Sequence, residues 1–150
     1  MSYIPKYIIK RIIPADALKN VDMDGKGKAD GFALKYVNVL APMQIEKNFD
    51  VEDLKKQLFD AELKVDGTSL DVKKGAIFVL GKKITITNIA DLGGLSLPVG
   101  GHMFIYFPQA GGLGAGKHTL VMKTKYKERV EETQLERDLA GTLTGKELKA

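Results

Sequence analysis

The sequence predicts an all-β protein, an antiparallel β-sandwich of about seven or eight strands with one short helix and a charged C-terminal tail. Short segments rich in β-branched and aromatic residues recur at intervals of about 8 to 15 residues. Glycine-rich turns separate these segments, and helical repeats are too few for an α/β fold. At 150 residues the chain has the length of one domain. We therefore expect a single domain over residues 1–140 and a flexible tail over residues 141–150.

The N-terminal quarter predicts a long hairpin. Residues 3–13 are apolar and β-branched, with Pro5 and Pro14 at their margins, which is typical of a terminal or edge strand. Residues 16–31 are polar and predict a turn region. Residues 32–40 place apolar side chains on one face, so we expect a strand that returns along the first one.

The segment from residue 50 to residue 58 predicts the short helix. Asp50 can cap its first turn, because an aspartate side chain accepts hydrogen bonds from the free N–H groups there. Val51, Leu54 and Leu58 follow at helical spacing and form a thin apolar face. We expect about two turns of helix.

The remainder of the chain reads as strands separated by turns. The Asp66–Gly67 pair is a strong signal for a tight hairpin turn. Residues 128–139 leave three readings open, namely an extension of the last strand, a charged helix or a mobile segment. The other expected strands cover residues 61–65, 76–80, 84–89, 102–107 and 118–126.

Composition excludes several classes of protein. The net charge of +4 comes from 23 basic and 19 acidic residues, and the basic ones are mostly lysines spread along the chain in pairs. Such a pattern is typical of a solvated surface and not of a nucleic-acid interface. The absence of cysteine excludes disulfides, thiolate metal sites and a cysteine nucleophile. The sequence has no apolar run long enough for a membrane span and no secretory signal, so we expect no membrane association and a cytoplasmic location.

The segment Gly111-Gly112-Leu113-Gly114-Ala115-Gly116-Lys117-His118 matches most of the phosphate-binding pattern G-x-x-x-x-G-K-[ST]. That pattern works when a helix leaves the loop, whereas residues 118–126 read as a strand. His118 also takes the place of the hydroxyl that binds Mg²⁺. We therefore predict the wide connection of a β-hairpin, with no nucleotide or other cofactor bound.

Asp22, Asp24 and Asp30 resemble the carboxylates of a calcium loop, in which glycines bend the backbone so that oxygens converge. Lys26 takes the position of the central carboxylate, where its ammonium group would repel a cation. Two interpretations stay open: a glycine-bent turn between two strands, or a weak cation site formed by the three aspartates.

The sequence offers little for catalysis, and we predict no catalytic residue and no intrinsic catalysis. His102 and His118 are the only histidines, and pairing Phe107 with His118 across the expected hairpin places the two imidazoles on opposite faces. An enzyme would need both in one cleft. No serine lies in a nucleophile-elbow context, and Glu131-Glu132 lies in a charged segment.

Residues 61–127 resemble the small (β) subunit of the bacterial C-glycoside deglycosidases. The matching segments are Leu63-Lys64-Val65-Asp66-Gly67, Ile77-Phe78-Val79-Leu80-Gly81-Lys82-Lys83-Ile84-Thr85 and the glycine-rich segment that ends at His118. The family loop has the form G-G-L-x-x-G-x-H and is followed by a strand. The resemblance implies a β-sandwich that packs against a larger metal-dependent barrel subunit, which carries the catalytic residues.

Two functions follow as hypotheses. The first is a non-catalytic β-sandwich subunit that stabilises or shapes a larger enzyme acting on glycoside-like substrates. The alternative is a self-associating binding module with a weak cation site and no enzymatic activity. The expected partner is accordingly either a larger catalytic subunit or further copies of the same chain.

Overall fold

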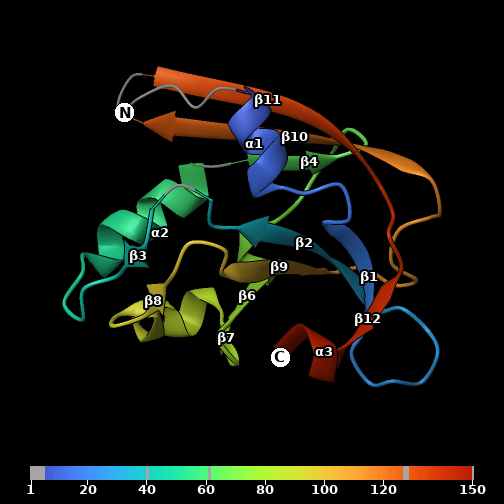
Figure 1. Cartoon of the computed structure of the whole chain (residues 1–150), viewed down its shortest axis with the longest axis horizontal. Helices are drawn as coiled ribbons and strands as arrows, with labels where there is room; N and C mark the ends of the chain where they lie inside the picture. The colour runs from blue at the N-terminus through green and yellow to red at the C-terminus, as the bar shows by residue number, and fades with distance from the viewer. Residues whose placement is uncertain (1–5, 40, 61, 127–128, 150) are drawn as a thin grey trace.

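The computed structural model describes residues 6–39, 41–60, 62–126 and 129–149. Within these ranges the chain forms twelve strands in three sheets and a few short helices, which confirms the all-β class (Figure 1). The strand count exceeds the expected seven or eight because several strands contain only two or three residues.

Two main sheets contain ten of these strands. The six-stranded sheet has the order β12 (Thr142–Thr144), β1 (Leu18–Asp22), β2 (Gly31–Val37), β9 (His102–Pro108), β6 (Ala76–Val79), β7 (Lys82–Ile84). The four-stranded sheet has the order β11 (Arg129–Asp138), β10 (Lys117–Tyr126), β4 (Glu62–Val65), β5 (Thr68–Ser69). A small third sheet pairs β3 (Met43–Gln44) with β8 (Ser96–Leu97). Neighbouring strands are antiparallel except for β1 and β12, which run parallel.

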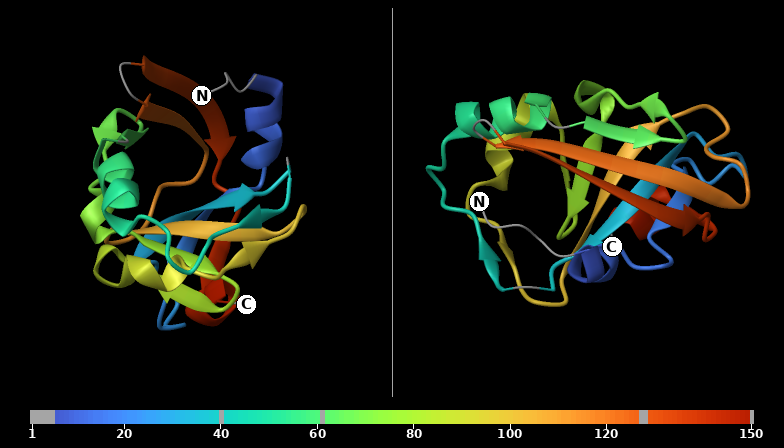
Figure 2. Two further views of the ribbon diagram at one scale, coloured as in Figure 1. Left: turned by 90° about the vertical axis from the view of Figure 1, so that its left-hand side faces the viewer. Right: turned by 90° about the horizontal axis from the view of Figure 1, so that it is seen from above.

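The two main sheets pack face to face through a shared apolar core (Figure 2). Leu18, Phe32 and Phe107 enter this core from the six-stranded sheet, and Leu120 and Leu135 enter it from the four-stranded sheet. All five side chains are at most 5% exposed. Burial of this apolar surface is the main favourable term that holds the sandwich together.

Five helical segments surround the sheets: α1 (Lys6–Ile12), α2 (Val51–Asp60), α3 (Gly145–Lys149) and the 3₁₀ helices η1 (Val72–Lys74) and η2 (Ile86–Leu92). The helix expected from residue 50 is confirmed as α2. Its cap is confirmed too, because the Asp53 N–H donates to Asp50 Oδ1 at 3.0 Å. Val51 and Leu54 of this helix pack with η2 against a separate apolar cluster around Ile84.

The expected N-terminal strand is wrong, because residues 6–12 form the helix α1. Proline is favoured at the start of a helix and shortly beyond its end, and Pro5 and Pro14 occupy those places in the sequence. Ile12 and Ile13 are buried in the core. This packing outweighs the intrinsic preference of isoleucine for strands.

The polar segment between residues 16 and 31 was expected to be a turn region, but its first part forms β1. Leu18 and Val21 are fully buried on opposite faces of the sheet. Because both faces of β1 are covered, its sequence lacks the alternation of polar and apolar residues that indicates a half-buried strand. The expected hairpin between residues 3–13 and residues 32–40 is therefore wrong. The strand expected at residues 32–40 is present as β2, but it pairs antiparallel with β1, from Leu18↔Leu34 to Val21↔Gly31.

The glycine-rich segment does not close a hairpin, contrary to the prediction. Strand β9, before it, pairs with β2 and β6, whereas β10, after it, pairs with β11 and β4. Residues 109–116 therefore cross from one main sheet to the other, and we call them the glycine crossover. The expected pairing of Phe107 with His118 does not occur, because these residues belong to different sheets.

The C-terminal segment differs from the expected flexible tail. Residues 129–138 form β11, so the segment is neither a helix nor an extension of the last strand but a separate strand that pairs antiparallel with β10. Residues 142–144 then pair with β1, and α3 buries Leu148 against Val21 and Phe78. Because an apolar side chain that is 2% exposed anchors this end, the domain boundary expected at residue 140 is corrected to include residues 141–149.

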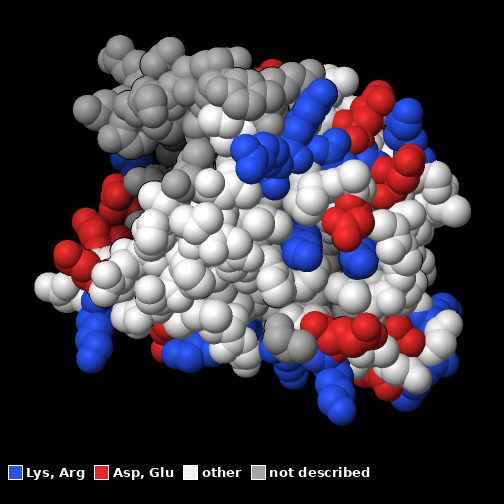
Figure 3. All heavy atoms as spheres, viewed as in Figure 1, with Lys and Arg blue, Asp and Glu red and all other residues white. Residues whose placement is uncertain are grey.

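Charged side chains of both signs are interspersed over the face shown in Figure 3. This mixture is typical of a solvated surface, as the sequence predicted. In the described ranges, no helix has the length and apolar character needed to cross a membrane.

Arg137 joins α1 to the four-stranded sheet. Its Nε and Nη2 donate to the Ile13 carbonyl at 3.0 and 2.6 Å, and Nε also lies 3.1 Å from the Pro14 carbonyl. Nη2 reaches the Lys10 carbonyl at 3.4 Å, and Nη1 donates to the Glu136 carbonyl at 2.7 Å. The guanidinium group thus supplies donors to carbonyls at the C-terminal end of α1, where a positive charge is also favoured.

We expect Arg137→Ala to lower the free energy of unfolding by about 1–3 kcal/mol, since it removes several charge-assisted hydrogen bonds. Arg137→Lys should recover only part of the loss, because one ammonium group cannot reach the same set of carbonyls. Denaturant unfolding measures both variants. The control is Arg11→Ala, which removes an exposed side chain on the last turn of the same helix. Equal losses in the Arg137→Ala and Arg11→Ala proteins would contradict this role.

Candidate functional site

Three segments that the sequence singled out are linked by hydrogen bonds in the fold. The loop that connects β1 to β2 and contains Asp22, Asp24 and Asp30 is called the aspartate loop here. The Gly111 N–H donates to the Ala29 carbonyl at 3.0 Å, and the Gln109 N–H donates to the Asp30 carbonyl at 2.9 Å, so this loop and the glycine crossover lie side by side. His118 then connects the crossover to the Asp66–Gly67 turn. These contacts define the candidate site.

The crossover is held to the six-stranded sheet by Asn20. The Leu113 N–H donates to Asn20 Oδ1 at 2.7 Å, and Asn20 Nδ2 donates to the Leu113 carbonyl at 2.9 Å. The amide side chain therefore pairs with Leu113 as a neighbouring strand would. Asn20 is 8% exposed, and burial strengthens the need for both bonds.

The N–H groups at the start of the crossover are occupied within the protein. Besides the bonds of Gly111 and Leu113, the Gly112 N–H donates to the Gln109 carbonyl at 2.8 Å. Gln109 Nε2 in turn donates to the Gly112 carbonyl at 3.0 Å. A phosphate cradle needs such N–H groups pointing at its ligand. This geometry gives the crossover a structural role.

Both ring nitrogens of His118 have a hydrogen-bond partner. Its Nδ1 lies 2.5 Å from Asp66 Oδ2, and its Nε2 lies 2.6 Å from the Gly114 carbonyl oxygen. Burial alone would lower the pKa of His118, but the hydrogen bonds to Asp66 and Gly114, with the charges of Asp66 and Asp138, outweigh burial. The net effect raises this pKa above its ordinary value of 6.5.

Asp66 is the first of the two central residues in the turn between β4 and β5. Its φ of +52° is followed by +84° at Gly67, as a type I′ hairpin turn requires, which confirms the expected turn. The hydrogen bond with His118 is the main cause that lowers the pKa of Asp66, and the bond donated by the Thr119 N–H adds to it. The carboxylate therefore joins the turn to β10 through both of its oxygens.

The aspartate loop uses its carboxylates to shape its own backbone. Asp22 is 7% exposed and accepts hydrogen bonds from the N–H groups of Lys26 at 3.2 Å and Gly27 at 2.7 Å. Asp30 Oδ2 accepts from the Met23 N–H at 2.9 Å. These contacts are those of a glycine-bent turn between two strands, the first of the two interpretations.

Asp30 also contacts the sheet through Tyr106. The Tyr106 hydroxyl donates to Asp30 Oδ1 at 3.0 Å. Burial, together with this hydrogen bond and the nearby charge of Asp30, raises the pKa of Tyr106 to about 12. Tyr106 therefore keeps its proton and acts as a donor over the physiological pH range.

A surface hollow of about 620 Å³ lies between the aspartate loop and the glycine crossover. It is lined by both acidic and basic side chains, among them Asp22, Asp24, Asp30, Lys26, Lys28 and Lys74. In the described residues, no group of three or more His, Asp or Glu side chains has a geometry that could hold a metal ion. Cation binding by Asp22, Asp24 and Asp30 stays a prediction.

The two histidines lie in different sheets, His102 in β9 and His118 in β10. His102 is exposed, and its ring meets the Phe104 ring edge-on with centroids 5.4 Å apart. Partial burial and the neighbouring Lys35 lower its pKa. His102 therefore shares no contact with the His118–Asp66 pair.

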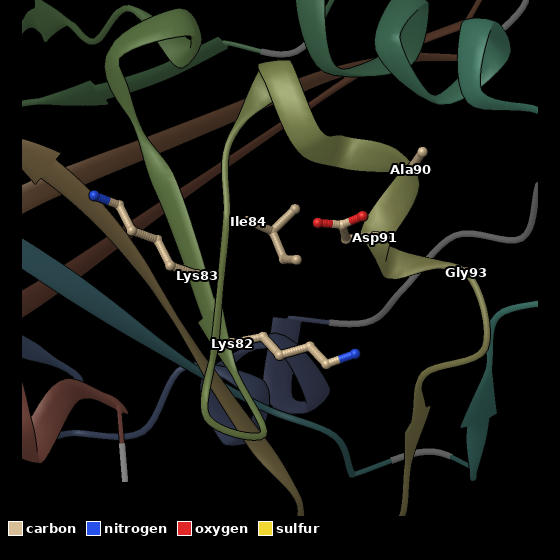
Figure 4. Close-up of a pocket in the computed structure, with 6 residues that line it drawn as sticks. All are labelled: Lys82, Lys83, Ile84, Ala90, Asp91 and Gly93. Carbon is tan, nitrogen blue, oxygen red and sulfur yellow. The ribbon is translucent and has the colours of Figure 1, made fainter.

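A second hollow, of about 460 Å³, lies beside β7 and η2 (Figure 4). Ile84 and Asp91 point toward one another across it, whereas Lys83 extends to the other side of the strand. Asp91 Oδ2 accepts a hydrogen bond from Asn88 Nδ2 at 3.2 Å. The hollow is open to solvent, and its polar groups do not form a nucleophile–base pair.

Sequence reasoning missed Asn20 and Arg137, which organise the site and its surroundings. Asparagine is disfavoured inside strands, and Asn20 lies between the buried Leu18 and Val21. Once this segment is known to be a strand, a buried asparagine indicates a side-chain hydrogen bond. No such signal marks Arg137, because its acceptors at the end of α1 are more than 120 residues away in the sequence.

No family model matches the chain, and no curated protein matches it.

Proposed function

We propose that this chain is a non-catalytic β-sandwich subunit that stabilises or shapes a larger enzyme acting on glycoside-like substrates in the cytoplasm. The observation that carries the proposal is the contact between His118 and Asp66. It joins two of the segments on which the resemblance to the deglycosidase small subunit depends, the Asp66–Gly67 turn and the glycine-rich segment.

The polar side chains of the candidate site make hydrogen bonds within the chain, and this supports a non-catalytic role. A catalytic histidine or carboxylate must leave at least one atom for substrate. The ring nitrogens of His118 and both oxygens of Asp66 contact other groups of this chain. Asp22 and Asp30 likewise accept hydrogen bonds from backbone N–H groups of their own loop. These groups fix the positions of the Asp66–Gly67 turn, the glycine crossover and the aspartate loop, whose exposed residues would form the surface that a partner protein contacts.

Purification of the native protein from its source tests the proposal. We expect the chain to coelute with a larger subunit, and separation of the two should lower the larger subunit's thermal stability or its activity on glycoside-like substrates. Light scattering gives the mass of the complex, and mass spectrometry identifies the second chain. Recovery of the chain alone in every preparation, with the mass of a single copy, would contradict the proposal.

The alternative, a self-associating module with a weak cation site, is favoured by one observation. Asp22, Asp24 and Asp30 line the same hollow, as a cation site on this loop would require. Under the leading proposal, calorimetric titration with Ca²⁺ should give no binding heat, because backbone N–H groups already occupy Asp22 and Asp30 and lysines line the same hollow. Binding heat and a higher melting temperature in millimolar Ca²⁺, both lost in Asp24→Asn, would favour the alternative.

A further inference from the structure

The contacts of His118 require a proton on each ring nitrogen. The atoms that face Nδ1 and Nε2 are a carboxylate oxygen of Asp66 and the carbonyl oxygen of Gly114, and both are acceptors without a proton to donate. A neutral imidazole has one N–H and one lone pair. Loss of either proton would therefore leave a nitrogen lone pair directed at an oxygen lone pair about 2.5 Å away. One of the two bonds must then break.

We propose that His118 is a proton-operated latch that fastens the glycine crossover to the turn between β4 and β5, and that loss of one imidazole proton releases the crossover at Gly114. The proposal concerns this chain alone and does not depend on the proposed function.

The groups around His118 favour release of the Gly114 bond over the Asp66 bond. Asp66 carries a full negative charge and is also held by the Thr119 N–H at 2.8 Å, whereas the Gly114 carbonyl is neutral. A neutral ring would therefore keep its remaining proton on Nδ1, toward Asp66. The Gly114 carbonyl would then face a lone pair.

The other charged groups near the ring come from β10 and β11. Asp138 contributes a second negative charge that favours the imidazolium. Arg137 lies directly opposite His118 in the strand register, but its guanidinium is occupied by carbonyls at the end of α1. Lys117, next to His118 in β10, points to the other face of the sheet and lies 3.7 Å from Glu136. The segment from Gly111 to Gly116 contains no charged residue.

The crossover has the freedom to move once Gly114 is released. Gly116 has a φ of +103° with open space around it, and a side chain at Gly114 would also meet open space. Two contacts that do not titrate limit the motion to residues 114 and 115. The hydrogen bonds of Leu113 with Asn20 hold the start of the crossover, and the Leu139 N–H, which donates to the Gly116 carbonyl at 2.9 Å, holds its end.

The sign of the pH effect follows from the two shifted groups. Because the pKa of His118 is raised in the folded chain, its stabilising contribution is present below 6.5 and is lost as pH rises through the raised value. Because the pKa of Asp66 is lowered, its contribution is lost only as pH falls through that lowered value. The latch is therefore closed between the lowered pKa of Asp66 and the raised pKa of His118, and it opens above the pKa of His118.

The absence of cysteine allows a direct test in the full chain. A nitroxide attached through Ala115→Cys, an exposed position next to Gly114, reports the mobility of the crossover by electron paramagnetic resonance. Nitrogen NMR shifts of the His118 ring give its titration midpoint in the same protein. We expect the mobile fraction to rise with pH at the midpoint of His118. A second label on Glu46→Cys, also exposed but far along the chain, should show no step there.

Two variants separate the latch from a general loosening of the fold. In His118→Gln the amide cannot titrate, so the pH step at residue 115 should disappear. Asp66→Asn removes the charge, and asparagine tolerates the positive φ of this position, so the step should move to lower pH together with the ring titration. Wild-type mobility without a step at the His118 midpoint would overturn the proposal. So would a step of unchanged midpoint in either variant, or a neutral His118 ring at a pH where the label is immobile.

Discussion

Replacement of Asn38 by aspartate should lower the free energy of unfolding by about 3–5 kcal/mol, the largest effect we expect of a polar substitution in this chain. Asn38 is 5% exposed, and its Nδ2 faces the carbonyl oxygens of Ala41 at 2.7 Å, Leu97 at 3.0 Å and Pro98 at 3.4 Å. An aspartate would keep the shape of the side chain but would direct a buried carboxylate at these acceptors.

Denaturant unfolding at several pH values measures this effect. Burial among acceptors should raise the pKa of the introduced carboxyl group, so the loss should be full at neutral pH and should shrink as pH falls through that raised pKa. Asn48→Asp is the matched control, since Asn48 is exposed and the same change there should be almost neutral. A small loss at Asn38 that does not vary with pH would show that the carbonyls do not surround this side chain.

Replacement of Gly112 by alanine should cost about 2–4 kcal/mol, which combines the strain of a positive φ with overpacking. Gly112 has a φ of +66°, and a Cβ at this position would overlap the amide group of Asn20. The overlap would push Asn20 away from Leu113, so the two hydrogen bonds that hold the crossover would weaken together.

Two other glycines of the crossover provide controls for this prediction. Gly114 has no positive φ and open space around it, so Gly114→Ala should be close to neutral. Gly111 has a φ of +80° but also open space, so Gly111→Ala should show the cost of strain alone. Thermal unfolding of the three variants should rank Gly112→Ala as the least stable and Gly114→Ala as the most stable. Equal stability of all three would contradict the packing of the crossover against Asn20.

Local signals in the sequence predict the turns and caps of this fold correctly. Asp50 caps α2, and Asp66–Gly67 forms the hairpin turn between β4 and β5. Both features were predictable because they depend on residues that are neighbours in the chain. The glycine crossover was expected to close a hairpin because a glycine-rich connection between two strands looks the same within one sheet and between two sheets. Strand partners distant in the sequence, such as β4 for β10, decide between these topologies.

The candidate site could be predicted only in part. His118 and the aspartates stand out in the sequence as residue types that carry chemistry, but their roles depend on their partners. His118 meets Asp66 across 52 residues, and Asn20 meets Leu113 across 93 residues. No periodicity or motif encodes such pairs. The sequence therefore shows His118 without its partners, whereas in the fold this residue joins the turn between β4 and β5 to the glycine crossover.

Amide hydrogen exchange in the glycine crossover and the aspartate loop tests the central claim most directly, namely that the donors of these two segments serve the fold and not a ligand. We expect the N–H groups of Gly111, Gly112, Leu113 and Gly27 to exchange far more slowly than in an unstructured peptide, because each donates a hydrogen bond within the chain. Addition of Mg²⁺-ATP or of Ca²⁺ should leave these rates unchanged. Exchange at the rate of an unstructured peptide, slowed when either ligand is added, would show that these N–H groups serve a ligand and not the fold.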